Sequence, residues 1–65
     1  MIIDKVGDYR LLSDFVNRGS ISVSTIPAGT VVRITAVDKE FHKVHSRQFD
    51  DWQYWNINAE PVEAS

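Results

Sequence analysis

The sequence contains no cysteine, so it offers no disulfide, no thiolate ligand for a metal and no cysteine nucleophile. No apolar run approaches the ~20 residues of a membrane-spanning helix, and the first residues lack the apolar segment of a secretory signal. Positive charge is not in excess either, because seven Lys and Arg residues stand against nine Asp and Glu residues, for a formal net charge of -2. These absences predict a cytoplasmic protein and weaken any general attraction to nucleic acid or anionic membranes.

Leucine, alanine and methionine are also scarce. Together they number 7, compared with 24 residues of the types Val, Ile, Thr, Phe, Tyr and Trp. Side chains that are aromatic or branched at Cβ pack well on a pleated surface, so the composition predicts an all-β fold. A chain of 65 residues forms one small domain that buries only about 60% of its unfolded surface. Barrel closure, good packing or association with another chain is therefore expected to support its core.

The clearest predicted strand covers residues 30–37. Its alternation places Val32, Ile34 and Ala36 on one uninterrupted apolar face. The strand follows residues 26–29, which have proline in the second position and glycine in the fourth, the preference of a type I turn.

Other segments alternate less clearly. The pattern predicts a hairpin turn over 38–40, a strand over 41–45, a polar loop over 46–51 and a final strand over 52–57. Residues 8–16 fit both a strand that runs into a long loop and an amphipathic helix. We prefer the strand, because the rest of the sheet needs a pairing partner.

Five short strands of this kind suit a small antiparallel barrel, which removes exposed sheet edges. The run Ile-Pro-Ala-Gly-Thr-Val-Val at 26–32, the pair Lys43-Val44 and the run Trp-Gln-Tyr-Trp at 52–55 resemble SH3-like barrel domains over residues 9–57. The chain also looks like the small single-domain SH3-like proteins of bacteriophages and other mobile elements. It lacks the run Ala-Leu-Tyr-Asp-Tyr, so polyproline-binding residues are not carried over.

The resemblance implies a five-stranded SH3-like barrel over residues 8–57, preceded by a lead-in or edge strand at 1–7 and followed by a flexible acidic tail at 58–65. It also implies a phage-encoded protein that binds a host protein and occludes it. The family itself specifies a fold far more than it specifies a function.

Side-chain parity along the final strand predicts which aromatic rings are exposed. Trp55 and Ile57 are the more apolar pair and are expected to point inward, which leaves Trp52 and Tyr54 outside. With Val44 pointing inward, the outward residues of the preceding strand are Phe41, Lys43 and His45. Aromatic rings beside cations are enriched at protein interfaces. The alternative is that these rings pack on one another or beneath a terminal segment.

These residues define the predicted partner-binding site. Its members are Trp52, Tyr54, Phe41, Lys43, Arg33, Arg47 and His45. The site predicts a protein-interaction module whose partner is another protein or a second copy of the chain, for instance in a self-associating structural subunit. A second hypothesis is nucleic-acid binding through a basic strip of Arg33, Lys39, Lys43, Arg47, His42 and His45. Asp38 and Glu40 interrupt that strip.

Catalysis and metal binding are not predicted. His42 and His45 are three apart, which places them on opposite faces of a strand and prevents them from converging on one zinc ion. The three glycines form no phosphate-binding loop, and no nucleophile motif accompanies the serines. We therefore expect a non-enzymatic protein without a metal or cofactor.

Overall fold

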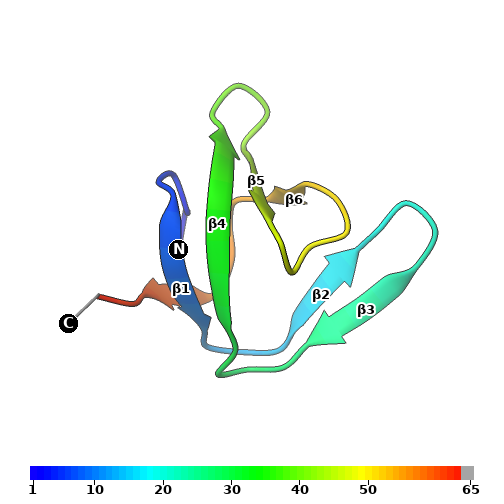
Figure 1. Ribbon diagram of the computed structural model, residues 1–65, viewed down its shortest axis with the longest axis horizontal. Coiled ribbons are helices and arrows are strands. Elements are labelled where there is room, and N and C mark those ends of the chain that lie inside the picture. The colour runs from blue at the N-terminus through cyan, green and yellow to red at the C-terminus, as the bar shows by residue number, and fades with distance from the viewer. Residues whose placement is uncertain (64–65) are drawn as a thin grey trace.

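The computed structural model describes residues 1–63, in which the chain forms seven β-strands and no helix (Figure 1). The strands are β1 (Gly7–Leu11), β2 (Phe15–Arg18), β3 (Val23–Ile26), β4 (Val31–Asp38), β5 (Lys43–Ser46), β6 (Gln53–Tyr54) and β7 (Ala59–Pro61). Five form one antiparallel sheet in the order β6-β5-β4-β1-β7, and β2 and β3 form a separate hairpin. The prediction of an all-β fold with a five-stranded antiparallel sheet is confirmed. Over these residues there is no helix that could cross a membrane.

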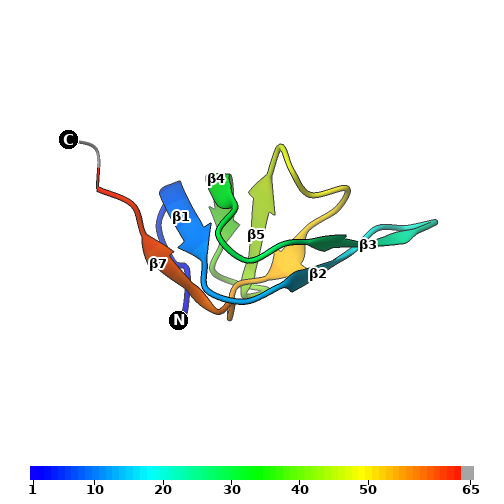
Figure 2. The same cartoon turned by 90° about the horizontal axis from the view of Figure 1, so that it is seen from below.

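The sheet curls around a single core, and the β2–β3 hairpin extends away from it (Figure 2). The buried apolar residues of that core are Ile3, Tyr9, Leu11, Val32, Ile34, Val44, Phe49, Ile57 and Ala59. Phe15 and Ile26 attach the base of the hairpin to it, with the Phe15 and Phe49 ring centroids 5.3 Å apart. The core therefore draws on segments from residue 3 to residue 59.

The prediction of a flexible tail at 58–65 is wrong for residues 59–61. These residues form β7, which pairs with β1, and Ala59 is buried. Pro61 occupies an edge strand, where a missing amide is tolerated. Arg10 of β1 and Glu60 of β7 form an ion pair at 2.9 Å. Residues 64 and 65 of the predicted tail lie outside the described residues.

The N-terminal segment, predicted as a lead-in or an edge strand, packs against the residues that follow β6. Ile3 is fully buried and its backbone N–H donates to the Trp55 carbonyl at 2.9 Å. Ile2 forms a β-bridge with Asn56. Residues 1–3 thus run antiparallel to 55–57 and belong to the same unit as residues 8–57.

Residues 8–16, which fit either a strand or a helix, contain strand β1 and the start of β2. The preference for a strand over a helix is confirmed. The long loop expected after it is instead the β2–β3 hairpin, in which Asn17 pairs with Ser24 and Phe15 with Ile26.

A β-bulge changes the predicted face of β4. The register passes from Ile34↔Ser46 to Ala36↔His45 and then Val37↔Val44, so one extra residue lies between Ile34 and Ala36. Val32 and Ile34 point inward as predicted, but beyond the bulge Val37, rather than Ala36, packs on the core. An inserted residue reverses the alternation of every side chain that follows it.

Two turns also differ from the prediction. The loop after β4 covers residues 39–42, so Phe41 lies in a turn and not in a strand. The turn before β4 is one residue later than expected, because the Thr30 amide donates to the Pro27 carbonyl at 3.3 Å. Gly29 is then its third residue with φ of 86°, a value that a type II turn requires and that favours glycine.

The side-chain amide of Gln53 connects the β2–β3 hairpin to the five-stranded sheet. Gln53 is 6% exposed, and its Oε1 accepts from the Arg18 N–H at 3.3 Å while its Nε2 donates to the Arg18 carbonyl at 2.9 Å. Nε2 also contacts Oδ1 of buried Asn17 at 3.2 Å and the Asp51 carbonyl at 3.1 Å. The amide therefore pairs with β2 as a neighbouring strand would.

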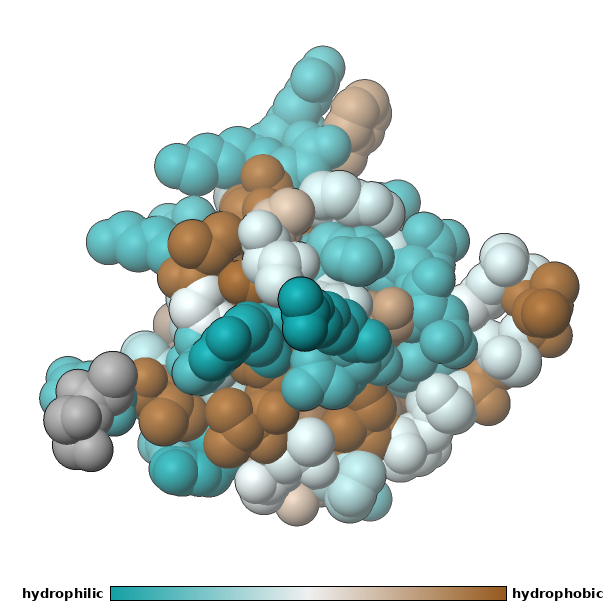
Figure 3. All heavy atoms as spheres, viewed as in Figure 1, coloured by the Kyte–Doolittle hydropathy of each residue, from teal (hydrophilic) through white to brown (hydrophobic). Residues whose placement is uncertain are grey.

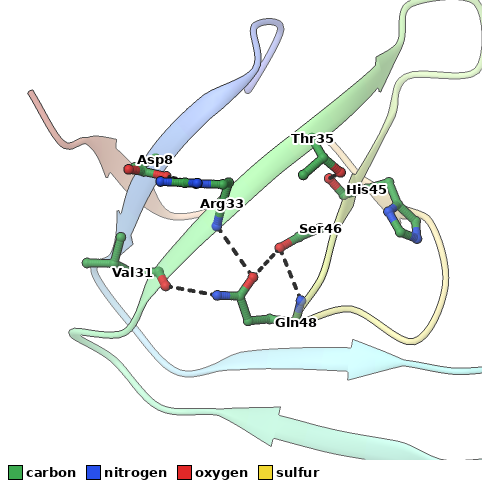
Figure 4. Close-up of polar contacts among 7 residues, drawn as sticks. All are labelled: Asp8, Val31, Arg33, Thr35, His45, Ser46 and Gln48. Atoms are coloured by element: carbon green, nitrogen blue, oxygen red, sulfur yellow. Dashed lines mark hydrogen bonds and ion pairs between the residues drawn. The ribbon is translucent and has the colours of Figure 1, made fainter. Parts of the chain in front are cut away.

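The side-chain amide of Gln48 pairs with the backbone of β4 in the same way, at a more exposed position (Figure 4). Its Nε2 donates to the Val31 carbonyl at 3.3 Å, and its Oε1 accepts from the Arg33 N–H at 3.4 Å and from the Ser46 hydroxyl. Strand β5 ends at Ser46, opposite Ile34. The Gln48 amide thus continues the pairing of β4 after its partner strand has ended.

We expect Gln53→Ala to lower the free energy of unfolding by about 2–3 kcal/mol, because the side chain of buried Asn17 and the backbone N–H and C=O of Arg18 would lose their partner. The comparison variant is Gln48→Ala, which should cost less, about 1–2 kcal/mol, because water can reach the β4 groups that it frees and only the buried Ser46 hydroxyl loses an acceptor. Urea denaturation measures both. An equal loss in the two variants would contradict the role of Gln53 as the anchor of the hairpin.

Ionisation of the Tyr9 phenol makes the free energy of unfolding depend on pH. Burial, with a smaller contribution from the charge of Asp4, raises the pKa of its phenol above the ordinary value of 10.0. The phenol donates to the Lys5 carbonyl at 2.8 Å. Because the folded pKa exceeds the unfolded one, the stability that this group contributes is complete below about pH 10 and is lost as the pH rises through the folded pKa. Unfolding curves of the wild type and Tyr9→Phe at rising alkaline pH should show that the variant lacks this decline.

Candidate interaction face

A cation–aromatic pair and an aromatic–aromatic pair lie side by side on the outer face of β5 and residues 52–54. Lys43 pairs across the strands with Tyr54, and its Nζ lies 5.4 Å from the centre of the Tyr54 ring. His45 lies against Trp52, with ring centroids 5.4 Å apart and planes tilted by 54°. We call these four residues the β5–β6 platform. Each aromatic ring of the platform therefore has a nitrogen-bearing neighbour on the adjacent segment.

The platform faces solvent. Tyr54 is 71% exposed and Trp52 is 40% exposed, whereas Gln53 between them is buried. On the other side of this segment, Ile57 is 2% exposed and Trp55 packs on the core. The predicted parity is confirmed for all of these residues, so the two outer rings are not sealed within the chain.

Arg33 belongs to the same outer surface but turns away from the platform. Its Nε donates to Oδ1 of Asp8 on β1 at 3.0 Å, and Figure 4 shows the guanidinium directed toward Asp8 while His45 lies on the opposite side of β4. This hydrogen bond and the carboxylate charge raise the pKa of Arg33. Arg33 is therefore partly neutralised and does not extend the platform.

Phe41 and Arg47 lie in the loops that flank β5, and both are exposed. Phe41 is 62% exposed, in the turn where the Phe41 and Glu40 amides donate to Oδ1 of Asp38. The structure thus brings four of the seven predicted site residues together as the platform. The other three are on the periphery.

Sequence reasoning missed Thr35. Its hydroxyl donates to the His45 carbonyl at 3.4 Å, at the bulged position of β4 beside the platform. No sequence signal marks it, because a bulge inserts one residue into a strand whose composition is otherwise regular.

The two histidines have separate aromatic partners. His42 stacks on Trp55, with ring centroids 4.8 Å apart and an interplanar angle of 15°, whereas His45 contacts Trp52. His42 has a positive φ of 59° in the turn after β4. Within residues 1–63, no three His, Asp or Glu side chains form a group that could hold a metal ion.

A shallow open groove of about 540 Å³ lies on the β1–β4 side of the molecule. Its lining residues are Val6, Gly7, Asp8, Arg33, Ile34, Thr35 and Val62. The only charged side chains in this lining are Asp8 and Arg33, which are already paired with each other. The groove offers no unpaired acid, base or nucleophile.

Comparison of the chain with protein family models, with curated proteins and with solved structures found no match. Function is therefore inferred from the surfaces described above.

Trp52 and Trp55 provide a direct test of the platform's exposure, because they are the same residue type on opposite sides of one segment. Trp52→Ala should lower the free energy of unfolding by about 1 kcal/mol or less, as expected for a surface aromatic pair. Trp55→Ala should cost about 2–4 kcal/mol, because it opens a cavity beside the core. Thermal or urea denaturation distinguishes the two, and a larger loss for Trp52 would show that its indole is a structural element.

Proposed function

We propose that the protein is a non-enzymatic interaction module that binds another protein through the β5–β6 platform. The observation that carries this proposal is the exposure of Trp52 and Tyr54 side by side, each in contact with a cationic or imidazole side chain. Aromatic residues are enriched among interface residues that contribute most to affinity. They bring a large contact area at a small cost in conformational entropy.

The contacts of the platform with its own chain support binding rather than a purely structural role. Tyr54 lies on β6, an edge strand of the sheet, and keeps most of its surface in water. Lys43 and His45 hold the two rings from one side, so little side-chain freedom would be lost on binding. Phe41 and Arg47 at the periphery are proposed to contact the rim of a larger partner.

The assignment of the fold to the SH3-like class is also a proposal. A five-stranded antiparallel sheet curled around one core is compatible with the SH3-like barrel that the sequence resembles. With that assignment, we propose a phage-encoded protein that occludes a host protein by covering the surface to which the platform binds.

Nucleic acid is the less favoured partner. Arg33, a member of the predicted basic strip, is paired with Asp8, and Asp38 is cross-strand neighbour to Lys43. Non-specific affinity for nucleic acid depends on cations that neutralise phosphates, and the formal net charge of the chain is -2. The platform thus offers stacking surfaces with few free cations.

The test is affinity capture from an extract of the native cell, with the wild type beside the double variant Trp52→Ala/Tyr54→Ala. The wild type should retain a protein that the double variant loses, while both keep the same far-ultraviolet circular dichroism. Ile21→Ser is the matched control, since Ile21 is 97% exposed and lies outside the platform. Equal retention by the wild type and the double variant would refute the proposal.

Salt and nuclease separate the two partner classes in the same experiment. Retention through the aromatic platform should change little between low and moderate salt and should survive nuclease. Retention through phosphates should fall by about 3.5-fold for each phosphate contact over a fourfold rise in salt. Loss on nuclease treatment would favour nucleic acid.

A further inference from the structure

The β2–β3 hairpin has an unpaired outer edge. β2 is held to the five-stranded sheet through Gln53, whereas β3 pairs only with β2 among the described strands. A free edge presents backbone N–H and C=O groups that can pair with another strand. Figures 1 and 2 show the hairpin extending away from the curled sheet, and residues 23–25 of β3 are exposed.

The hydrogen-bond pattern identifies which backbone groups are free. The Gly19 N–H donates to the Ser22 carbonyl at 2.8 Å, so these two residues form a hydrogen-bonded pair. Such pairs alternate along an antiparallel ladder, and the register then makes Asn17 and Ser24 the next one. Val23 and Thr25 must therefore direct their N–H and C=O groups away from β2, toward solvent.

The edge lacks the features by which proteins block pairing. Residues 19–32 contain no charged residue, and β3 contains no proline, lysine or bulge. The exposed side chains of β3 and of the hairpin tip are apolar or small. Val23 is 62% exposed, and Ile21 at the tip of the hairpin is 97% exposed. Figure 3 shows hydrophobic atoms at the far end of the hairpin. Natural edge strands are usually protected by charge, proline or covering segments.

We propose that β3 pairs antiparallel with β3 of a second copy of this chain, forming a four-stranded sheet with the order β2-β3-β3-β2. A two-fold axis at Ser24 would place Val23 of each copy opposite Thr25 of the other. That register pairs the free N–H and C=O groups identified above, for four hydrogen bonds across the axis. Val23 and Thr25 point to the same face of the hairpin, so two pairs of branched side chains would align across the junction.

Charge favours a second copy as the occupant. The formal net charge of -2 would oppose self-association at a charged surface, but the β3 edge carries no charge. The charged residue nearest to it on the hairpin is Arg18, on β2. The two Arg18 residues would be separated by three strand spacings, about 14 Å, which exceeds the screening length at physiological salt. The contact is also isologous, so it closes as a dimer rather than extending as a filament.

The experiment is sedimentation analysis of the intact chain over a range of concentrations reaching about 1 mM, a weak-dimer affinity. The wild type should shift from monomer to dimer. Thr25→Pro removes an outward N–H that β2 does not use, and Val23→Lys adds like charges near the axis. Each should raise the dimer dissociation constant by about tenfold or more. Thr25→Val, which keeps the N–H, should dimerise as the wild type does.

Amide hydrogen exchange supplies a second measurement that does not depend on whether the proline variant folds. The Val23 and Thr25 amides should exchange quickly in dilute protein and slowly in concentrated protein. A wild type that stays monomeric throughout, or Thr25→Pro and Val23→Lys variants that both dimerise normally, would overturn the proposal. So would dimerisation lost only in Trp52→Ala/Tyr54→Ala, which would place the interface on the platform. If the Val23 and Thr25 amides exchange slowly only when another protein is added, the β3 edge binds that protein and not a second copy of the chain.

Discussion

The pairing of the Gln53 amide with the backbone of Arg18 determines both where the hairpin lies and which side chains face outward. Gln53 is buried and contacts Arg18 through both its oxygen and its nitrogen. Because successive residues of a strand point to opposite faces, the inward direction of Gln53 sends Trp52 and Tyr54 outward. The interaction that stabilises the interior of the molecule therefore also creates its most exposed aromatic surface. A change at this position would affect the fold and the platform together.

Side-chain amides replace strand residues that so short a chain does not supply. Strand β6 has only two residues and β5 ends at Ser46, which would leave groups of β2 and β4 without partners. Gln53 and Gln48 pair with these groups at distances of 2.9–3.4 Å. An amide can do this because it carries a donor and an acceptor in the arrangement of a peptide group. Within residues 1–63, no buried side-chain polar atom lacks a partner, as a small core with little stability to spare requires.

The sequence predicts the features that depend on alternation within one segment. Composition indicated the all-β class, and the apolar pair Trp55 and Ile57 indicated which way the final segment faces. Alternation failed at the bulge between Ile34 and Ala36, since nothing in the local residue types marks an extra residue. β7 was missed because three residues carry too little periodicity, and its position depends on pairing with β1, about 50 residues earlier. The convergence of Lys43 and His45 with Trp52 and Tyr54 could be predicted, whereas the diversion of Arg33 to Asp8 required knowledge of the register between β1 and β4.

The β5–β6 platform and the free edge of β3 lie apart because the hairpin turns its other strand, β2, toward the sheet. β2 contacts the five-stranded sheet through Gln53, so the free edge of β3 faces away from β6 and its platform. Pairing at β3 would therefore leave Trp52 and Tyr54 of both copies exposed. A dimer would carry two platforms related by a two-fold axis, and a partner with two matching sites would bind the second at a high effective concentration. Weak contact through one small platform could then give tight overall binding. This consequence matters for a chain of 65 residues, because a single platform of four side chains buries far less area than a stable interface needs.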